Sequence, residues 1–256
     1  MSKFIEKLKQ LSEGAPQPIG FRPREAASAR PKIQLVIMAG DGTPTEAMKA
    51  ADSVVVTASS TAAAVKMLKV MAKGTGSILG ARIEADGDMD AQKLAEAGAD
   101  FIVFGPNVPL AGLLEEKIGK IIEVDSFLSD WMLRSLNAMP VDAVLVSHHK
   151  KEGAVVTFED LLVFQRLGAV LNKPLLIPVP GIISEKELST LWEAGVDGVV
   201  VPAEAGQDAE AVVKIRDIIS RLPYPSNKSK EKTSPIAPRV SLKEPEPEEE
   251  EEEDDE

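Results

Sequence analysis

The sequence predicts an α/β fold, a (β/α)8 TIM barrel with an extra N-terminal helix and a disordered acidic C-terminal tail. Eight short apolar runs alternate with eight helical patterns between residues 33 and 221. Several runs are apolar throughout, which is typical of strands in a parallel sheet covered on both faces. One phrase also recurs: LAEAGADFIVFGP begins at Leu94 and LWEAGVDGVVVPA begins at Leu191, 97 residues later. Eight regular units and this long period favour a closed barrel over an open, doubly wound sheet.

The strands are expected in two alternating sets. One set comprises the runs IQLVIMAG, SILGARIE, KIIEVDS and PLLIPVP, and the other follows the repeated phrase and its looser copies. The predicted strands begin near residues 33, 53, 77, 101, 120, 142, 175 and 198. The helical patterns cover residues 44–51, 60–73, 89–97, 109–118, 127–138, 157–171, 184–194 and 207–221.

The repeated phrase has the form L-x-E-A-G-x-D-x-x-V, which is typical of a helix that runs into a strand. The glycine is the residue that commonly ends a helix, because it adopts a left-handed conformation without strain. The aspartate marks the turn, and the valine-rich segment is the strand. Aligning the looser copies with the phrase brings four aspartates into register, namely Asp52, Asp100, Asp142 and Asp197.

Residues 1–14 are predicted to form an additional helix. Phe4, Ile5, Leu8 and Leu11 recur at helical spacing, so the helix has one apolar face. The simplest interpretation is that this helix caps the barrel, and the alternative is a helix that binds a membrane surface or a partner. The predicted domains are the N-terminal helix and lead-in (1–31), the barrel (32–225), and the linker and tail (226–256).

Composition excludes several classes of site. The chain has 256 residues and no cysteine, which excludes disulfides, thiolate nucleophiles and cysteine-ligated metal clusters. No apolar run approaches the ~20 residues of a membrane span. The N-terminus has no apolar core of the signal-peptide type, so a cytoplasmic location is expected.

The charge is concentrated at the C-terminus. Residues 244–256 contain 11 acids and no base, residues 226–243 sum to +4, and residues 1–225 sum to −5, which gives the total of −12. Nothing in this balance predicts a nucleic-acid surface. The tail is expected to be disordered, because it has few apolar groups to bury. It could increase solubility, tether a basic protein partner, or imitate an anionic ligand at an anion site.

The barrel fold predicts where chemistry would lie, because active sites of (β/α)8 enzymes are built at the carboxyl ends of the strands. Glu84 and Asp125 end two odd-numbered strands, and His148 follows the sixth strand. These three are the candidate catalytic residues, as an acid/base pair or as ligands of a divalent metal. The alternatives are equally simple: the acids cap the next helix, and His148 and His149 are exposed loop residues.

The segment IPVPGIISEKELSTLWEAGVDGVVVPA resembles the last quarter of the aldolase-type, phosphate-binding barrels, which include ribulose-phosphate-binding and flavin-binding members. The resemblance implies a backbone anion site for a phosphate-bearing ligand or FMN at Gly181, Ile182 and Ser184. Ser184 and Glu187 form a capping-box pattern, which starts a helix there. After the last strand the chain departs from the family: Pro202, Ala203 and Glu204 stand where a glycine is usual, and Gly206 could substitute for it.

Lysine placement narrows the reaction classes. A Schiff-base aldolase needs a desolvated lysine inside the barrel, and no predicted strand interior contains one. The function predicted is that of an enzyme, a lyase, an isomerase or a flavin-dependent oxidoreductase, that binds a small anionic ligand. The alternative is a catalytically inactive barrel that acts as a binding or structural protein through its acidic tail or N-terminal helix.

Overall fold

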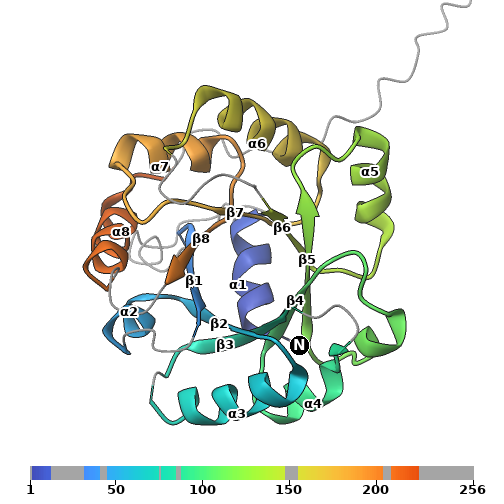
Figure 1. Ribbon diagram of the computed structural model, residues 1–256. Helices are drawn as coiled ribbons and strands as arrows, with labels where there is room; N and C mark the ends of the chain where they lie inside the picture. Colours follow the sequence, from blue (N-terminus) through green and yellow to red (C-terminus); the bar gives the residue numbers. More distant parts are fainter. Residues whose placement is uncertain are drawn as a thin grey trace, which may run out of the picture.

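The computed structural model describes residues 2–12, 32–40, 45–74, 76–84, 88–147, 155–203 and 209–224. Its eight strands are all parallel and pair in chain order, and β8 pairs with β1 to close the barrel (Figure 1). The predicted (β/α)8 fold is therefore confirmed. The predicted linker and acidic tail lie outside the described residues, so the domain boundary at residue 225 stays a prediction.

The elements follow the expected alternation. The strands are β1 (Gln34–Ala39), β2 (Ser53–Ala58), β3 (Ile78–Ile83), β4 (Phe101–Phe104), β5 (Gly119–Asp125), β6 (Ala143–Ser147), β7 (Leu175–Pro178) and β8 (Gly198–Ala203). The helices are α1 (Lys3–Ser12), α2 (Thr45–Ala50), α3 (Thr61–Met71), α4 (Ala91–Glu96), α5 (Asp130–Ala138), α6 (Phe158–Val170), α7 (Glu185–Glu193) and α8 (Ala209–Arg221). No helix in the described segments is both long and apolar enough to cross a membrane.

The helix expected over residues 109–118 is wrong. The structure has a single 3-10 turn, η3 (Leu110–Leu113), between β4 and β5. Leu110 and Leu114 are exposed and Leu113 is only partly buried against the core, so this segment buries little apolar surface before Ile118. A short helix is stabilised mainly by such burial, which explains why none forms here.

The apolar core is divided by the sheet into two layers. Side chains that point outward from the strands pack beneath the helices and form the larger cluster. Side chains that point inward form a second cluster inside the barrel, and it includes Val36, Val55, Val103, Leu145 and Val200. This division follows from the two-residue period of a strand, in which neighbouring side chains lie on opposite faces.

Helix α1 closes the inner cluster from the amino-terminal end of the strands. Figure 1 shows α1 in the middle of the ring of strands. Phe4, Ile5 and Leu8 are fully buried inside the barrel, and the Phe4 ring stacks on Phe101 with 4.7 Å between centroids. The prediction that this helix caps the barrel is confirmed, and its apolar face is buried within the molecule.

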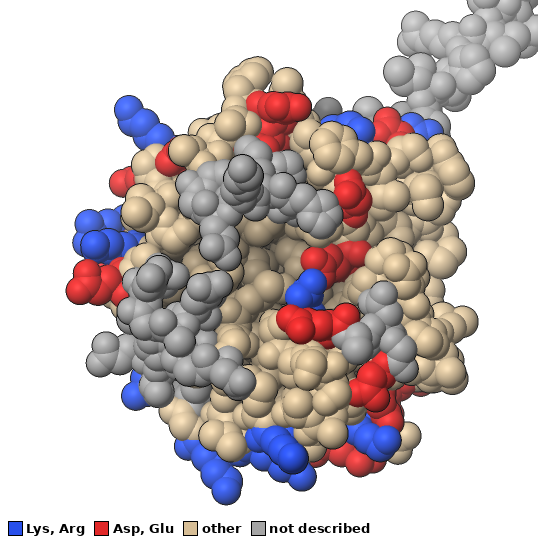
Figure 2. Space-filling view, in the orientation of Figure 1, with Lys and Arg blue, Asp and Glu red and all other residues tan. Residues whose placement is uncertain are grey.

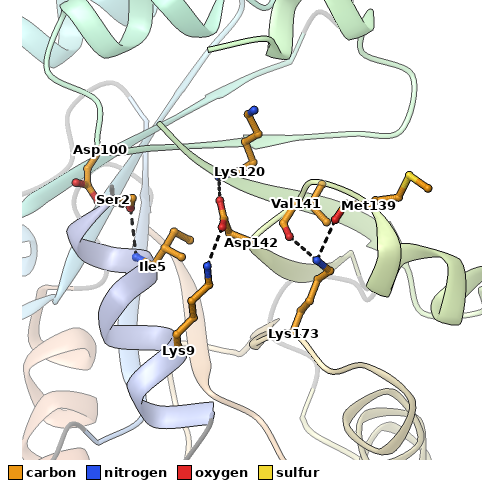
Figure 3. Close-up of polar contacts among 9 residues, drawn as sticks. All are labelled: Ser2, Ile5, Lys9, Asp100, Lys120, Met139, Val141, Asp142 and Lys173. Atoms are coloured by element: carbon orange, nitrogen blue, oxygen red, sulfur yellow. Dashed lines mark hydrogen bonds and ion pairs between the residues drawn. The ribbon is translucent and has the colours of Figure 1, made fainter. Parts of the chain in front are cut away.

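Asp100 anchors the first turn of α1 (Figure 3). Its carboxylate accepts hydrogen bonds from the Ser2 hydroxyl at 2.6 Å and from the backbone N–H groups of Lys3 and Phe4, both at 2.9 Å. Lys9 Nζ, farther along the helix, lies 3.0 Å from Asp142 Oδ1. Both contacts tie α1 to aspartates of the aligned set, Asp100 in the repeated phrase and Asp142 in a looser copy.

All four repeated aspartates have a structural role at this end of the barrel. The backbone N–H of each donates to a carbonyl of the preceding strand, on Leu35, Leu79, Lys120 and Leu175 respectively. In three copies the carboxylate also accepts the N–H of that same residue, as in the pairs Asp52–Leu35, Asp142–Lys120 and Asp197–Leu175. In the fourth copy the carboxylate of Asp100 binds α1 instead.

The two glycines of the exact phrase end their helices as predicted. Gly98 and Gly195 have φ of 101° and 97°, in the left-handed region. Their N–H groups donate to Ala95 and Trp192, and the next residues donate five positions back to Leu94 and Leu191. This pair of bonds is the Schellman motif, so the repeated sequence is scaffold.

Candidate functional site

The carboxyl ends of the strands form the mouth of the barrel, and Figure 2 shows a hollow in the middle of this face with blue and red side chains at its side. Two charged residues stand there on inward positions. Arg82 of β3 comes two residues after Gly80, which faces the Phe101 ring, and Glu123 of β5 comes two residues after Ile121 of the inner cluster. The alternation of a strand therefore directs both side chains into the mouth.

Arg82 and Glu123 form a two-point ion pair. Arg82 Nε donates to Glu123 Oε2 at 2.8 Å, and Nη2 donates to Oε1 at 3.3 Å. The side chains keep 30% and 19% of their exposure, so the pair is reached by solvent from one side. Nη1 donates to none of the described residues, which leaves part of the guanidinium fork available to a ligand.

The opposite wall of the mouth is apolar. Met38 of β1 packs against the inner cluster, and Pro178 of β7 and Pro202 of β8 lie two residues beyond the inward-pointing Leu176 and Val200. These three positions offer no side-chain hydrogen-bond donor, and the prolines offer no backbone N–H either. Among the described residues, the mouth is thus charged on the side of β3 and β5 and apolar on the side of β7, β8 and β1.

Two of the three predicted catalytic residues are described, and both lie at the mouth. Glu84 follows β3 with the same parity as Arg82, is exposed, and its carboxylate has no partner among the described residues. Asp125 is exposed too, but its Oδ1 accepts the Phe127 N–H at 2.7 Å, so it stabilises its own turn. His148 lies outside the described residues, and the catalytic roles of all three stay predictions.

A metal centre has no support within the described part of the chain. No three histidine or acidic side chains there are grouped as metal ligands would be. Glu84 and Asp125 are not joined to a third described ligand, and the proposed third member, His148, is outside the description. A divalent metal or FMN at this mouth remains an untested prediction of the sequence.

The predicted anion loop lies between β7 and α7. Gly181 is half-buried and Ile182 is almost fully exposed, while Gly206, the fourth predicted residue, lies outside the described residues. The capping box of Ser184 and Glu187 is present: the Ser184 hydroxyl and N–H donate to Glu187 Oε2 at 2.6 and 2.8 Å. Both bonds lower the pKa of the Glu187 carboxyl below its ordinary value, and the bond from the Ser184 hydroxyl has the larger effect. An external anion at Ser184 would have to displace this carboxylate.

Arg82 and Glu123 were missed by the analysis of the sequence, which considered only residues at strand ends. A signal was present. In SILGARIE the buried outward positions are Leu79, Ala81 and Ile83, so Gly80 and Arg82 must face inward. The same parity places Glu123 inside the barrel.

No protein-family model matches the chain, and no curated protein matches it. Solved structures do match. The thiamine phosphate pyrophosphorylase of Pyrococcus furiosus is 15% identical with a TM-score of 0.55, over 74% of this chain and 96% of that chain. A variant of the tryptophan synthase alpha-subunit of Pyrococcus furiosus is 12% identical with a TM-score of 0.55, over 75% and 98%. The orotidine 5'-phosphate decarboxylase of Pyrococcus horikoshii is 16% identical with a TM-score of 0.54, over 72% and 98%.

These matches confirm the resemblance to aldolase-type barrels at the level of the fold. Each covers nearly the whole of the solved chain, so the shared part is the complete barrel. Identities of 12–16% do not carry a substrate or a reaction from those enzymes to this chain.

Proposed function

We propose that the protein is an enzyme that binds a small anionic ligand, a carboxylate or a phosphate ester, at the mouth of the barrel. Arg82 is the anion-binding group, and the observation that carries the proposal is its partial use by Glu123. Glu123 fixes the guanidinium plane through Nε and Nη2 and leaves Nη1 directed at no described residue. A planar guanidinium presents paired donors that match carboxylate and phosphate oxygens.

The charge of the mouth supports a small ligand with a localised anion rather than a polyanion. Glu84 and Asp125 lie at the ends of the same two strands as the Arg82–Glu123 pair, so acids outnumber bases among the described residues on this side of the mouth. The apolar wall of Met38, Pro178 and Pro202 would contact the uncharged part of the ligand. Two of the solved barrels act on compounds whose names include a phosphate, which agrees with an anionic ligand.

Glu84 is the best candidate for proton transfer. Among the described acids at the mouth, Glu123 is held by Arg82, Asp125 by the Phe127 N–H and Asp88 by the Thr61 N–H. Only Glu84 has a carboxylate that no described residue engages, and it stands two residues from Arg82. A carboxylate so placed could accept or donate a proton on a ligand bound to Arg82.

The alternative is an inactive barrel that acts through its acidic tail or its N-terminal helix, and the structure argues against the helix. A role through the N-terminal helix would need an exposed apolar face, and Phe4, Ile5 and Leu8 are buried inside the barrel. The acidic tail lies outside the described residues, so a role through the tail stays an alternative proposal.

Ligand screening with matched variants tests the proposal. Small carboxylates and phosphate esters are screened by thermal shift, and the affinity of the best compound is measured by calorimetry. Arg82→Ala should abolish binding, and Glu123→Gln should weaken it by about tenfold, since the guanidinium loses its orientation. Glu84→Gln should leave binding intact and abolish turnover.

Arg216→Ala is the matched control. Arg216 also forms a two-point pair, with Asp52 at 2.8 and 2.9 Å, at the opposite end of the barrel. This variant should lower stability and leave affinity unchanged. Equal loss of affinity in Arg82→Ala and Arg216→Ala would contradict the proposal, as would tight binding that survives Arg82→Ala.

A further inference from the structure

Three large aromatic side chains are exposed on the outside of the barrel. Phe127, Trp131 and Phe158 retain 76%, 69% and 73% of their exposure. The chain contains only ten aromatic residues, so three of them stand in water at a high cost in hydrophobic stabilisation. Exposed apolar groups of this size commonly mark a surface that binds another protein.

The three side chains lie on the outer face formed by α5, α6 and the segments that precede them, and together with Val155 and Leu162 they are called the aromatic patch here. Phe158, Leu162 and Arg166 follow one another at intervals of four along α6, so they share a face of that helix. Arg166 Nη2 donates to the Leu128 carbonyl at 2.6 Å. Leu128 lies in the turn between Phe127 and Trp131, so the α6 stripe runs beside that turn.

The figures agree with this placement. Figure 1 shows α5 and α6 as neighbours on the outside of the barrel, and the two helices are in contact. In Figure 2 the margin of the molecule over α5 is largely tan, with blue and red side chains at its upper end.

The size of the aromatic patch fits a dimer interface. An aromatic side chain can bury about 150–250 Å², so three that are about 70% exposed offer roughly 300–500 Å². A standard interface buries about 800 Å² on each partner, and about 65% of it is apolar in homodimers, or roughly 500 Å². The three aromatics with Val155 and Leu162 supply that apolar share.

The outer faces of α5 and α6 carry exposed charges of both signs, which suits a second copy of this chain better than a basic or an acidic partner. Arg134 on α5 and Glu159 on α6 are both exposed, and neither forms an ion pair with the described residues. A two-fold axis brings the same patch of each copy together. It can therefore place Arg134 of one copy opposite Glu159 of the other.

We propose that the aromatic patch is the interface of a symmetric homodimer. The proposal does not depend on the proposed ligand or reaction, because it rests on the outer face of α5 and α6. The test uses the full chain in sedimentation velocity over a dilution series from about 100 µM to 1 µM, the range in which standard interfaces of modest affinity dissociate. The wild-type protein should sediment as a dimer at the high end.

Trp131→Glu and Phe158→Glu should convert the protein to a monomer over the whole series, because each buries a charge in the interface. Val70→Glu is the matched control. Val70 is 73% exposed on α3, on the other side of the barrel, so this variant should remain dimeric (Figure 1). Circular dichroism and the unfolding midpoint identify any variant that fails to fold.

Charge reversal provides a test that spares the aromatic residues. Arg134→Glu and Glu159→Arg should each weaken the dimer, and the double variant should restore it. Fluorescence gives a second readout, since Trp131 is exposed and Trp192, the other tryptophan, is buried. Trp131 emission should shift to longer wavelength on dilution. A wild-type monomer at about 100 µM, or glutamate variants that stay dimeric, would overturn the proposal.

Discussion

Arg82 and Arg216 make similar bonds in different settings, and the difference assigns their roles. Each guanidinium uses two nitrogens to bind one carboxylate. Asp52, the partner of Arg216, also accepts the Leu35 N–H, so that pair joins α8 to the start of two strands. Glu123, the partner of Arg82, accepts no other described donor. Among the described residues the pair at the mouth joins only β3 and β5, which is compatible with the ligand site proposed for it.

The same comparison shows what the sequence could predict at this scale. Glu84 and Asp125 were found because the barrel fold directs attention to strand ends, and both do lie at the mouth. Arg82 and Glu123 lie two residues before Glu84 and Asp125, deeper in the barrel. Finding them requires the parity of the strand, which becomes certain only when the buried outward face is known. The bond from the Phe127 N–H to Asp125 depends on a local turn that no residue pattern specified.

The Ser184–Glu187 capping box should contribute to stability in a pH-dependent way. The pKa of Glu187 is lowered in the folded protein by the Ser184 hydroxyl and N–H. A lowered pKa stabilises the fold above the unfolded value of about 4.5, and the contribution is lost as the pH falls through the folded pKa. Ser184→Ala should therefore lower the free energy of unfolding by about 1 kcal/mol at neutral pH and by less at about pH 3.

Urea titration at several pH values measures the effect of Ser184→Ala. Ser129→Ala is the control, because Ser129 stands at the N-cap of α5 without a side-chain capping bond. It should have little effect at any pH. A loss for Ser184→Ala that is the same at every pH would show that the Glu187 carboxylate is not the partner that matters.

At the scale of the element, the aspartate of the repeated pattern has two roles. In three copies its carboxylate binds the preceding strand, and in the copy of Asp100 it binds α1. The glycine and the aspartate were predictable from the sequence, and both the Schellman motifs and the turns are present. The diversion of Asp100 to α1 was not predictable, because it depends on a helix 96–98 residues earlier in the chain. The copy Asp197 accepts the Leu175 N–H, and Asp142 both accepts the Lys120 N–H and binds Lys9 of α1.

Helix α1 should be an integral part of the barrel core. Phe4 is fully buried and stacks on Phe101, so Phe4→Ala would remove most of a buried aromatic side chain and leave a cavity in the inner cluster. Such a change typically costs about 3–5 kcal/mol. Urea unfolding should show this loss, and Lys7→Ala, an exposed position in the same helix, should show almost none. A loss below about 1 kcal/mol for Phe4→Ala would mean that α1 is detachable.

At the scale of the whole molecule, the fold could be predicted because its signals are redundant. Eight apolar runs, eight helical patterns and a repeat of two units all specify the same closed barrel, and only the helix over 109–118 failed. The site had no such redundancy. It depends on single side chains such as Arg82, and on the loops after β1, β3, β6 and β8, which lie partly outside the described residues.

The acidic tail should influence the mouth through its long-range field and not by occupying it. Residues 226–256 carry a net charge of −7, and the mouth already holds Glu84, Glu123 and Asp125 around Arg82, which repel a run of glutamates. Ile215, Ile219 and Leu222 bury the apolar face of α8 within the described residues, and residues 226–256 contain few large apolar side chains. Removal of residues 226–256 should therefore leave the unfolding midpoint unchanged.

Ligand binding separates the two roles of the tail. With the field alone, truncation should raise affinity for an anionic ligand by less than about threefold at low salt, and the gain should vanish near 0.15 M salt, where the Debye length is about 8 Å. A tail that imitates the ligand would give a much larger gain, because a tethered competitor acts at an effective concentration of about millimolar. The free peptide 244–256, added to the truncated protein, decides the matter: displacement of the ligand at physiological salt would show that the tail enters the site.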